Sequence, residues 1–272
     1  MALRTYQAHL RAPERPRWSR YCGRRALHEK LAVGLKYLGI LLALAVLAAS
    51  WPAWRLFVEL DKARSEDPLV WEEDIRALEA ATRGSFPPGE AVVFIGSSSI
   101  RFWDSLHVDM APIPVIQHGF GGAKLNDVVY YADRLVSAYR PRSVVVFAGT
   151  NDITPSGAKR PEILLASYRE FVGEVRQQQP DLPIYYIAIT PSPRRWEVWP
   201  TAQTANALIA DFCAPDDGLH FIDTGAALLD RAGEADPSNY VFDKLHLSEK
   251  GYRIWTNIIR PRLLADMPEY AE

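Results

Sequence analysis

Residues 91–99 read AVVFIGSSS, a compact apolar run that passes directly into a glycine and three serines. The run is short and rich in β-branched residues, which is typical of a strand buried on both faces of a sheet. Similar runs occur at 114–117, 143–148, 184–189 and 219–222. Helix-like stretches lie between and after them, at 124–139, 161–179, 201–212 and 248–264. Short buried strands that alternate with helices predict a three-layer α/β/α fold with a five-stranded parallel sheet.

Composition limits the class of protein. The chain has 272 residues, 48% of them hydrophobic, and a formal net charge of -2. This length suits one α/β domain with additional segments. Because nucleic-acid-binding proteins usually carry a clear basic excess, we expect no nucleic-acid partner.

The cysteines and histidines argue against a metal site. Cys22 and Cys213 are too few for a disulfide framework or for a zinc site built on cysteines. The histidines that could contribute to a metal site are not spaced as a ligand set: His107, His118, His220 and His246. We therefore expect neither a metal nor a cofactor.

An uncharged apolar segment runs from Tyr37 to Trp54. A helix of this length spans about 27 Å, close to the hydrocarbon thickness of a bilayer. We predict a transmembrane helix over residues 37–57, with Trp51 and Trp54 at an interface. Two alternatives are a cleaved signal peptide, for which Ala48 and Ala49 offer small residues near a cleavage site, and a buried core helix.

The charges on either side of this segment indicate an orientation. Basic residues precede it: Arg4, Arg11, Arg15, Arg17, Arg20, Arg24, Arg25, Lys30 and Lys36. A mixed set follows it: Arg55, Glu59, Asp61 and Lys62. The positive-inside rule then makes residues 1–36 a basic cytoplasmic segment and places the rest of the chain on the extracytoplasmic, periplasmic or extracellular, side of a single-pass membrane protein.

The segment that follows joins the membrane helix to the α/β domain. Residues 59–67 are charged and predict a linker, and residues 68–83 carry apolar side chains at helical spacing. We therefore predict a linker and a surface helix over residues 58–85, followed by one catalytic-type domain over residues 86–268.

Polar and glycine-rich turns follow the first two predicted strands, where open parallel sheets bind their ligands. Ser98 lies in a strand-to-helix turn that would expose its Oγ atom, although serine-rich turns also cap helices. Residues 118–123 read HGFGGA, and their glycines leave backbone N–H groups such as that of Gly122 accessible. A tight turn before a helix is the alternative interpretation of this second segment.

Two further segments carry groups suited to acyl transfer. The third strand ends in Gly149-Thr150-Asn151-Asp152, where the Asn151 amide can donate to a developing oxyanion. An Asx turn or a helix cap would use the same residue. Near the end of the chain, Asp243 precedes His246 by three residues, so its carboxylate can accept from Nδ1–H and leave Nε2 to take a serine proton.

These segments together resemble the four conserved blocks of the SGNH (GDSL-type) hydrolases, in the same order. The blocks are Gly96-Ser97-Ser98, Gly122, Gly149-Thr150-Asn151-Asp152 and Asp243-Lys244-Leu245-His246. The similarity extends over nearly all of residues 91–252. It implies the flavodoxin-like SGNH hydrolase fold and esterase, lipase or thioesterase chemistry that needs no metal.

The resemblance also implies a role for each matching residue. Ser98 would be the nucleophile, His246 the general base and Asp243 its orienting partner. The oxyanion hole would consist of the backbone N–H groups of Ser98 and Gly122 and the side chain of Asn151.

The chain departs from the family pattern at one position. Ser97 stands where the family usually has aspartate, so three consecutive serines leave Ser98 and Ser99 as alternative nucleophiles. Alignment of Gly96 with the family glycine, and of Trp103 with a frequent downstream aromatic residue, favours Ser98.

The loop after the fourth strand, residues 190–199, is rich in proline and tryptophan. It predicts a substrate pocket formed by Arg194, Arg195 and Trp196, in which an arginine meets an anionic or hydroxylated substrate. A packed surface loop is the alternative.

The substrate would be a small-molecule, lipid or carbohydrate ester. A carbohydrate O-acetylesterase, a lysophospholipase, a thioesterase and the platelet-activating-factor acetylhydrolase-like branch all fit the resemblance. An O-acyltransferase acting on envelope polysaccharide and a non-catalytic binding module on the same scaffold remain as further alternatives.

Overall fold

The computed structural model describes residues 18–270, which divide into two compact units at Phe57 and Val58. Helix α1 (Trp18–Arg64) contributes to both units. In the first unit, Val33–Trp51 has a mean hydropathy of 2.0, and none of its residues is buried. Within the described residues it is the single helix long and apolar enough to cross a membrane, and signal sequences share these properties.

The linker predicted over residues 59–67 is wrong for residues 59–64, because α1 continues through them. Their charged side chains face partners that lie far away in the sequence. Lys62 Nζ pairs with Asp74 at 2.7 Å, and Glu59 lies 3.4 Å from Arg101. These contacts within the second unit fix a segment whose charge suggested an exposed connection.

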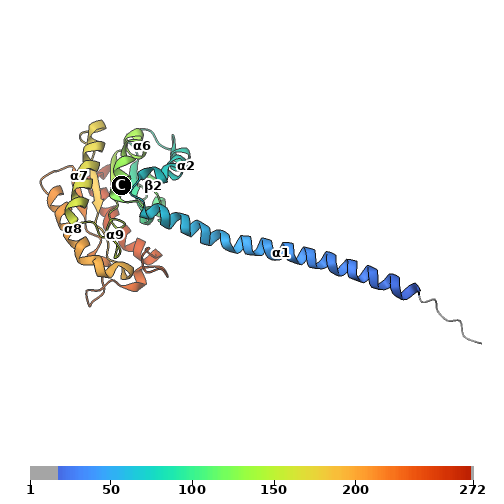
Figure 1. Ribbon diagram of the computed structural model, residues 1–272. Helices are drawn as coiled ribbons and strands as arrows, with labels where there is room; N and C mark the ends of the chain where they lie inside the picture. The colour runs from blue at the N-terminus through green and yellow to red at the C-terminus, as the bar shows by residue number, and fades with distance from the viewer. Residues whose placement is uncertain (1–17, 271–272) are drawn as a thin grey trace, which may run out of the picture. The chain divides into compact units, whose positions relative to one another are not determined.

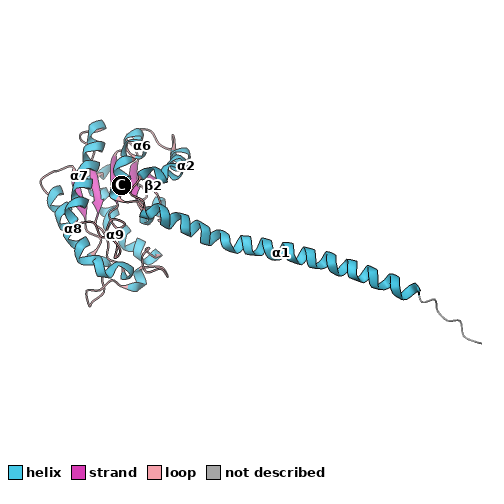
Figure 2. Cartoon of the chain, viewed as in Figure 1, coloured by secondary structure: helices cyan, strands magenta, loops and turns pink. Residues whose placement is uncertain are grey.

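The second unit is built on five parallel strands: β1 (Val92–Gly96), β2 (Val115–Gly119), β3 (Ser143–Phe147), β4 (Ile184–Ile187) and β5 (Leu219–Ile222). Their order is β2-β1-β3-β4-β5, and every neighbouring pair is parallel. Figure 2 shows this sheet in magenta among the cyan helices. The predicted flavodoxin-like, three-layer α/β/α fold is confirmed.

Helices connect and cover the strands (Figure 1). After α1 they are α2 (Glu72–Thr82), α3 (Ser98–Arg101), α4 (Leu106–Asp109), α5 (Leu125–Tyr130), α6 (Ala132–Leu135), α7 (Pro161–Gln178), α8 (Trp199–Cys213) and α9 (Glu249–Asp266). Short 3-10 turns lie at Pro68–Trp71, Ser137–Tyr139, Pro193–Val198, Ala226–Leu228, Pro237–Asn239 and Pro268–Tyr270.

The helix predicted over residues 124–139 is interrupted. It divides into α5, α6 and a 3-10 turn, because the backbone at Tyr131 leaves helical geometry with φ −98° and ψ 7°. The Tyr131 side chain is fully buried, and its hydroxyl donates to the Pro68 carbonyl at 3.0 Å. A tertiary hydrogen bond and a buried ring at the break are contacts that helical periodicity cannot anticipate.

Alternate residues of the strands supply two hydrophobic clusters, one on each face of the sheet. On β1, Val93 and Ile95 pack with residues of α2 and α5–α8, whereas Val92 and Phe94 pack with residues of α3, α4 and α9. Trp71 is fully buried in the first cluster and meets the Phe120 ring edge-on at 5.9 Å. The segment before β1 is therefore integral to the core of the second unit.

His118 lies fully buried at the end of β2. Its Nδ1–H donates to the Leu135 carbonyl at 2.7 Å, and its Nε2 lies 2.9 Å from the Thr82 hydroxyl. Burial lowers the pKa of His118 to about 4 from its ordinary value of 6.5, although the Leu135 carbonyl and Glu79 favour the protonated form. The imidazole is thus neutral in the folded protein at neutral pH.

Because His118 is buried and neutral, we predict that the folded protein loses stability in acid and that a substitution of His118 removes this loss. Between pH 6.5 and pH 4 the unfolded chain binds a proton at His118 and the folded chain does not, so stability falls as the pH falls through this window. The pKa difference corresponds to about 3 kcal/mol in the free energy of unfolding. In His118→Asn, which keeps a donor for Leu135, urea unfolding between pH 7 and pH 4 should lack this loss.

The wild type has to be compared with the variant because two buried carboxyl groups add stability as the pH falls, which opposes the effect of His118. Burial raises the pKa of Asp127 to about 6 and also raises the pKa of Asp152. Exposed His107 provides the matched control, since His107→Asn should retain the pH dependence of the wild type. Equal pH dependence in His118→Asn and wild type would contradict the prediction.

Candidate active site

The site lies where β1 and β3 end, at the point where the strand order reverses and open α/β sheets bind ligands. Ser98 is the first residue of α3, which follows β1 after Ser97. At Gly96 the chain runs so close to β3 that a Cβ would lie 2.1 Å from the Phe147 carbonyl oxygen. The lack of a side chain at Gly96 therefore lets Ser98 stand directly over the sheet edge.

A tight turn before α9 presents the histidine and the aspartate. The backbone of Tyr240 pairs with that of Leu247, and the Val241 N–H donates to the His246 carbonyl at 2.9 Å. Lys244 takes a left-handed conformation with φ 61°, which closes the turn. Asp243 and His246 are thereby brought onto one side of the turn.

These three side chains form a continuous hydrogen-bonded chain. His246 Nε2 lies 2.9 Å from Ser98 Oγ, and His246 Nδ1 lies 2.6 Å from Asp243 Oδ2. Because a carboxylate accepts at Nδ1, the neutral imidazole carries its proton there and leaves Nε2 to accept from the serine. Ser98, rather than Ser99, makes the contact with His246.

The Asp243 carboxylate is held on both oxygens. Oδ1 accepts the backbone N–H groups of Leu245 at 2.9 Å and of His246 at 3.0 Å. Partial burial raises the pKa of Asp243, but the hydrogen bonds from His246 and Leu245 outweigh it, and the net pKa lies below the ordinary value. Asp243 is therefore ionised where it faces the imidazole.

The groups predicted to form an oxyanion hole are the backbone N–H groups of Ser98 and Gly122 and the side chain of Asn151. Within residues 18–270, the backbone N–H groups of Ser98 and Gly122 are bonded to no acceptor. The Asn151 Nδ2 donates to the Ala123 carbonyl at 3.0 Å, which leaves its second N–H available. A Cβ on Gly122 would lie 2.5 Å from the Ala63 Cβ and 3.9 Å from Asn151 Nδ2, so only glycine fits between them.

Arg195 fixes the orientation of the Asn151 amide. Its guanidinium donates from Nη2 to Asn151 Oδ1 at 3.0 Å and from Nη1 to the Thr150 carbonyl. Burial, with a smaller contribution from Arg194, lowers the pKa of Arg195 to about 10, so it remains charged at neutral pH. With Oδ1 occupied by Arg195, the amide turns its N–H groups toward Ala123 and Gly122.

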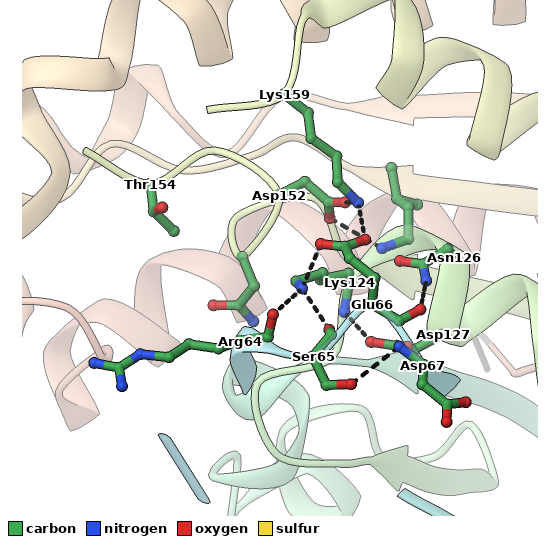
Figure 3. A network of polar contacts seen from close by, with 12 residues as sticks. Arg64, Ser65, Glu66, Asp67, Lys124, Asn126, Asp127, Asp152, Thr154 and Lys159 are labelled. Carbon is green, nitrogen blue, oxygen red and sulfur yellow. Dashed lines mark hydrogen bonds and ion pairs between the residues drawn. The ribbon is translucent and has the colours of Figure 1, made fainter. Parts of the chain in front are cut away.

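A polar network ties the end of α1 to the loop that carries Asn151 (Figure 3). Lys124 Nζ donates to the Ser65 carbonyl at 2.6 Å, to Glu66 at 2.7 Å and to the Arg64 carbonyl at 3.3 Å. Lys159 joins Glu66 at 2.8 Å to Asp152 at 3.0 Å. The cationic groups thus neutralise the carboxylates and cap the carbonyls at the helix end.

The three residues predicted to form a substrate pocket do not all line one cavity. Arg194 and Arg195 line a cavity of about 550 Å³ together with Asn151, and the Arg195 guanidinium is bonded to Asn151 and Thr150. Trp196 is not among the residues that line this cavity. It packs against the hydrophobic clusters and lies parallel to Trp199 at 6.5 Å.

The sequence did not point to Arg64, which lines the same cavity, or to Phe102, whose ring meets that of His246 edge-on at 5.0 Å. Arg64 lay within a predicted linker, and Phe102 had no partner within its own segment. Among residues 18–270, no group of three or more histidine, cysteine, aspartate or glutamate side chains is arranged to hold a metal ion.

Comparisons with known proteins bear on the family and the fold of this part of the chain. The model of the GDSL-like Lipase/Acylhydrolase family matches residues 89–254. A comparison with curated proteins found no match.

Solved structures share the fold. A protein from Streptococcus pneumonia described as a platelet activating factor is 19% identical, with a TM-score of 0.61 over 80% of this chain and 99% of its own. A GDSL-like lipase from Bacteroides thetaiotaomicron is 19% identical, with a TM-score of 0.58 over 71% and 98%. A carbohydrate esterase family 3 protein from Talaromyces cellulolyticus is 17% identical, with a TM-score of 0.54 over 66% and 99%.

Proposed function

Because the chain belongs to the GDSL-like lipase/acylhydrolase family, we propose that it is a serine esterase that cleaves carboxylic esters through an acyl-enzyme. Ser98 is the nucleophile, His246 the general base and Asp243 the residue that orients the base. The observation that carries the proposal is the hydrogen-bonded chain from Asp243 Oδ2 through the imidazole to Ser98 Oγ. This is the arrangement that activates a serine for attack.

The reaction proceeds in two halves. His246 Nε2 takes the proton of Ser98 Oγ as the oxygen attacks the ester carbonyl, and a tetrahedral intermediate forms. When the intermediate collapses, the bond to the alcohol breaks and His246 returns the proton to the leaving oxygen. Water, deprotonated by His246, then attacks the acyl-enzyme. As the bond between the acyl carbon and Ser98 Oγ breaks, His246 returns the proton to Ser98 and the acid is released.

The oxyanion of each intermediate lies among the N–H groups of Ser98, Gly122 and Asn151. Such donors stabilise the charge that develops in the transition state, and loss of one costs about 100- to 1,000-fold in rate. Arg195 keeps the Asn151 amide in the donating orientation and polarises it through Oδ1. Its contribution to catalysis is therefore indirect, through the position of Asn151.

Covalent labelling tests the activated serine directly. A fluorophosphonate probe should label the full-length chain in nonionic detergent, and peptide mass spectrometry should locate the adduct at Ser98, because only a serine bonded to a base reacts rapidly. Heat-denatured protein provides the control. A folded chain that remains unlabelled would contradict the esterase and favour a binding module, and an adduct at Ser99 would reassign the nucleophile.

The N-terminal helix supports a membrane tether for this esterase. We propose residues 1–36 as a cytoplasmic segment, 37–57 as the membrane-spanning part and 86–268 as the hydrolase domain on the extracytoplasmic side. Residues 58–85 connect the two, and their buried Trp71 and Ile75 support close packing of this segment on the hydrolase domain. The basic residues before the apolar run support the orientation.

A further inference from the structure

The space immediately around Ser98 is too small to hold a whole substrate. The cavity that Ser98, Asn151 and His246 line measures about 10 Å³, roughly the room that one water molecule needs. Only the reacting carbonyl fits there. The remainder of an ester must therefore extend into the neighbouring cavities.

Two larger cavities adjoin this centre, one on each side. A cavity of about 600 Å³ shares His246 with it, and a cavity of about 550 Å³ shares Asn151 with it. Each larger cavity shares one lining residue with the centre, so the two lie beside different walls of it, in two directions in which an ester could extend. The chemistry of the two walls differs.

The wall of the cavity beside His246 is mostly apolar, and its charged side chains are all acidic. Phe102, Val241, Phe242 and Tyr252 contribute to its wall. Phe242 is 95% exposed, and Phe102 and Val241 in the same wall are exposed as well, so apolar surface gathers at this cavity. The charged residues in the wall are Asp104, Asp243 and Glu249, so an anion would be repelled there.

The cavity beside Asn151 is cationic. Arginine and lysine side chains in its wall outnumber the carboxylates of Glu66 and Asp152. The cationic residues are Arg64, Lys124, Lys159, Arg194 and Arg195. Both carboxylates are already neutralised by Lys124 and Lys159, so they do not offset the arginines.

Two of the arginines are available to a ligand. Within the described residues, neither Arg64 nor Arg194 forms an ion pair, and both are exposed. In Figure 3 the Arg64 side chain extends away from the network that holds its own carbonyl. The Arg194 backbone N–H is bonded to the Lys244 carbonyl at 3.0 Å, which fixes the start of its side chain.

From this arrangement we infer that the substrate is an amphiphilic ester, with an apolar chain in the Phe102–Phe242 cavity and an anionic group bound by Arg64 and Arg194. The inference rests on the proposed esterase function and specifies its substrate class. A phosphate or carboxylate suits the second site, because guanidinium groups bind both in bidentate geometry. The ester carbonyl lies at Ser98, between the apolar chain and the anionic group.

Matched esters test this substrate class with the full-length chain in nonionic detergent. The first pair is 1-octanoylglycerol 3-phosphate and 1-octanoylglycerol, which differ only in the phosphate on the alcohol side. The second pair is monooctyl succinate and octyl butyrate, which differ in a carboxylate on the acyl side. In at least one pair, kcat/KM for the anionic ester should exceed that for the neutral ester about tenfold or more.

Substitutions then assign the preference to its residues. Arg64→Gln/Arg194→Gln should reduce the anionic preference to about onefold, through a higher KM rather than a lower kcat. Arg76→Gln, at an exposed arginine paired with Glu72, should keep the preference of the wild type. Phe242→Ser should weaken the gain in kcat/KM from acetyl to octanoyl esters.

The outcomes separate this inference from the esterase itself. Hydrolysis of neutral esters without a preference in either pair, or a preference that survives in the double variant, would overturn the amphiphile inference and leave the esterase intact. Failure to hydrolyse any ester, together with failure of fluorophosphonate labelling, would overturn both.

Discussion

Ser98→Ala is expected to lower kcat for ester hydrolysis by about 10,000-fold or more, since removal of the nucleophile eliminates the acyl-enzyme route. Alanine removes only the hydroxyl, whose contact is His246 Nε2 at 2.9 Å, so thermal unfolding should change little. A p-nitrophenyl acetate assay and a thermal melt of the same preparation measure both quantities. Residual hydrolysis in this variant should stem from the oxyanion donors alone.

Ser99→Ala is the matched control for this prediction. The Ser99 backbone carbonyl accepts from the Tyr252 hydroxyl at 2.9 Å, and alanine preserves that bond because it involves no side-chain atom of Ser99. Activity should therefore stay within about threefold of the wild type. If Ser99→Ala is inactive and Ser98→Ala is active, the assignment of the nucleophile is wrong.

Asp243→Asn should lower kcat by about 1,000- to 10,000-fold without unfolding the turn. The amide oxygen can still accept from the N–H groups of Leu245 and His246, as Oδ1 of the aspartate does now. The amide nitrogen would then face His246 Nδ1 and donate to it. This forces the imidazole proton onto Nε2, and a protonated Nε2 cannot accept the proton of Ser98.

The measurement is kcat for a short p-nitrophenyl ester at neutral pH, with thermal unfolding as the check on the fold. Asp236→Asn is a suitable control, because Asp236 also accepts a backbone N–H in a turn, that of Ser238 at 2.9 Å, but has no contact with His246. Activity of Asp243→Asn within tenfold of the wild type would refute the tautomer argument.

The sequence predicted the sheet because buried strands carry a short-range pattern, and it pointed to the candidate triad through the strand ends and the resemblance of four segments to a known family. The strands begin and end within two residues of the predicted apolar runs, since a buried parallel strand has to be apolar throughout. Ser98, Asn151 and the Asp243–His246 pair could be found because strand ends meet at one edge of the sheet. Asp243 and His246 lie three residues apart in a single turn, so their contact depends on local sequence alone.

Contacts between distant segments could not be predicted in the same way. Glu59 and Lys62 look like linker residues until Arg101 and Asp74 face them in the folded chain. Arg195 was expected to meet substrate, yet its guanidinium is used internally by Asn151 and Thr150. The partners of a side chain depend on tertiary packing. The type of a charged residue in a loop does not show whether it will contact substrate or another part of the chain.

The close packing of Ala63 on Gly122 limits where a shortened, soluble form of this protein can begin. A chain that starts at Val58 retains the helical turns that carry Ala63 and Arg64, and with them the carbonyls that Lys124 caps. A chain that starts at the first strand would lose one wall of the cavity beside Asn151 and leave Lys124 without those acceptors. The compact unit that carries the candidate site therefore extends upstream of residues 89–254, which match the family model, into the last turns of the helix that precedes them.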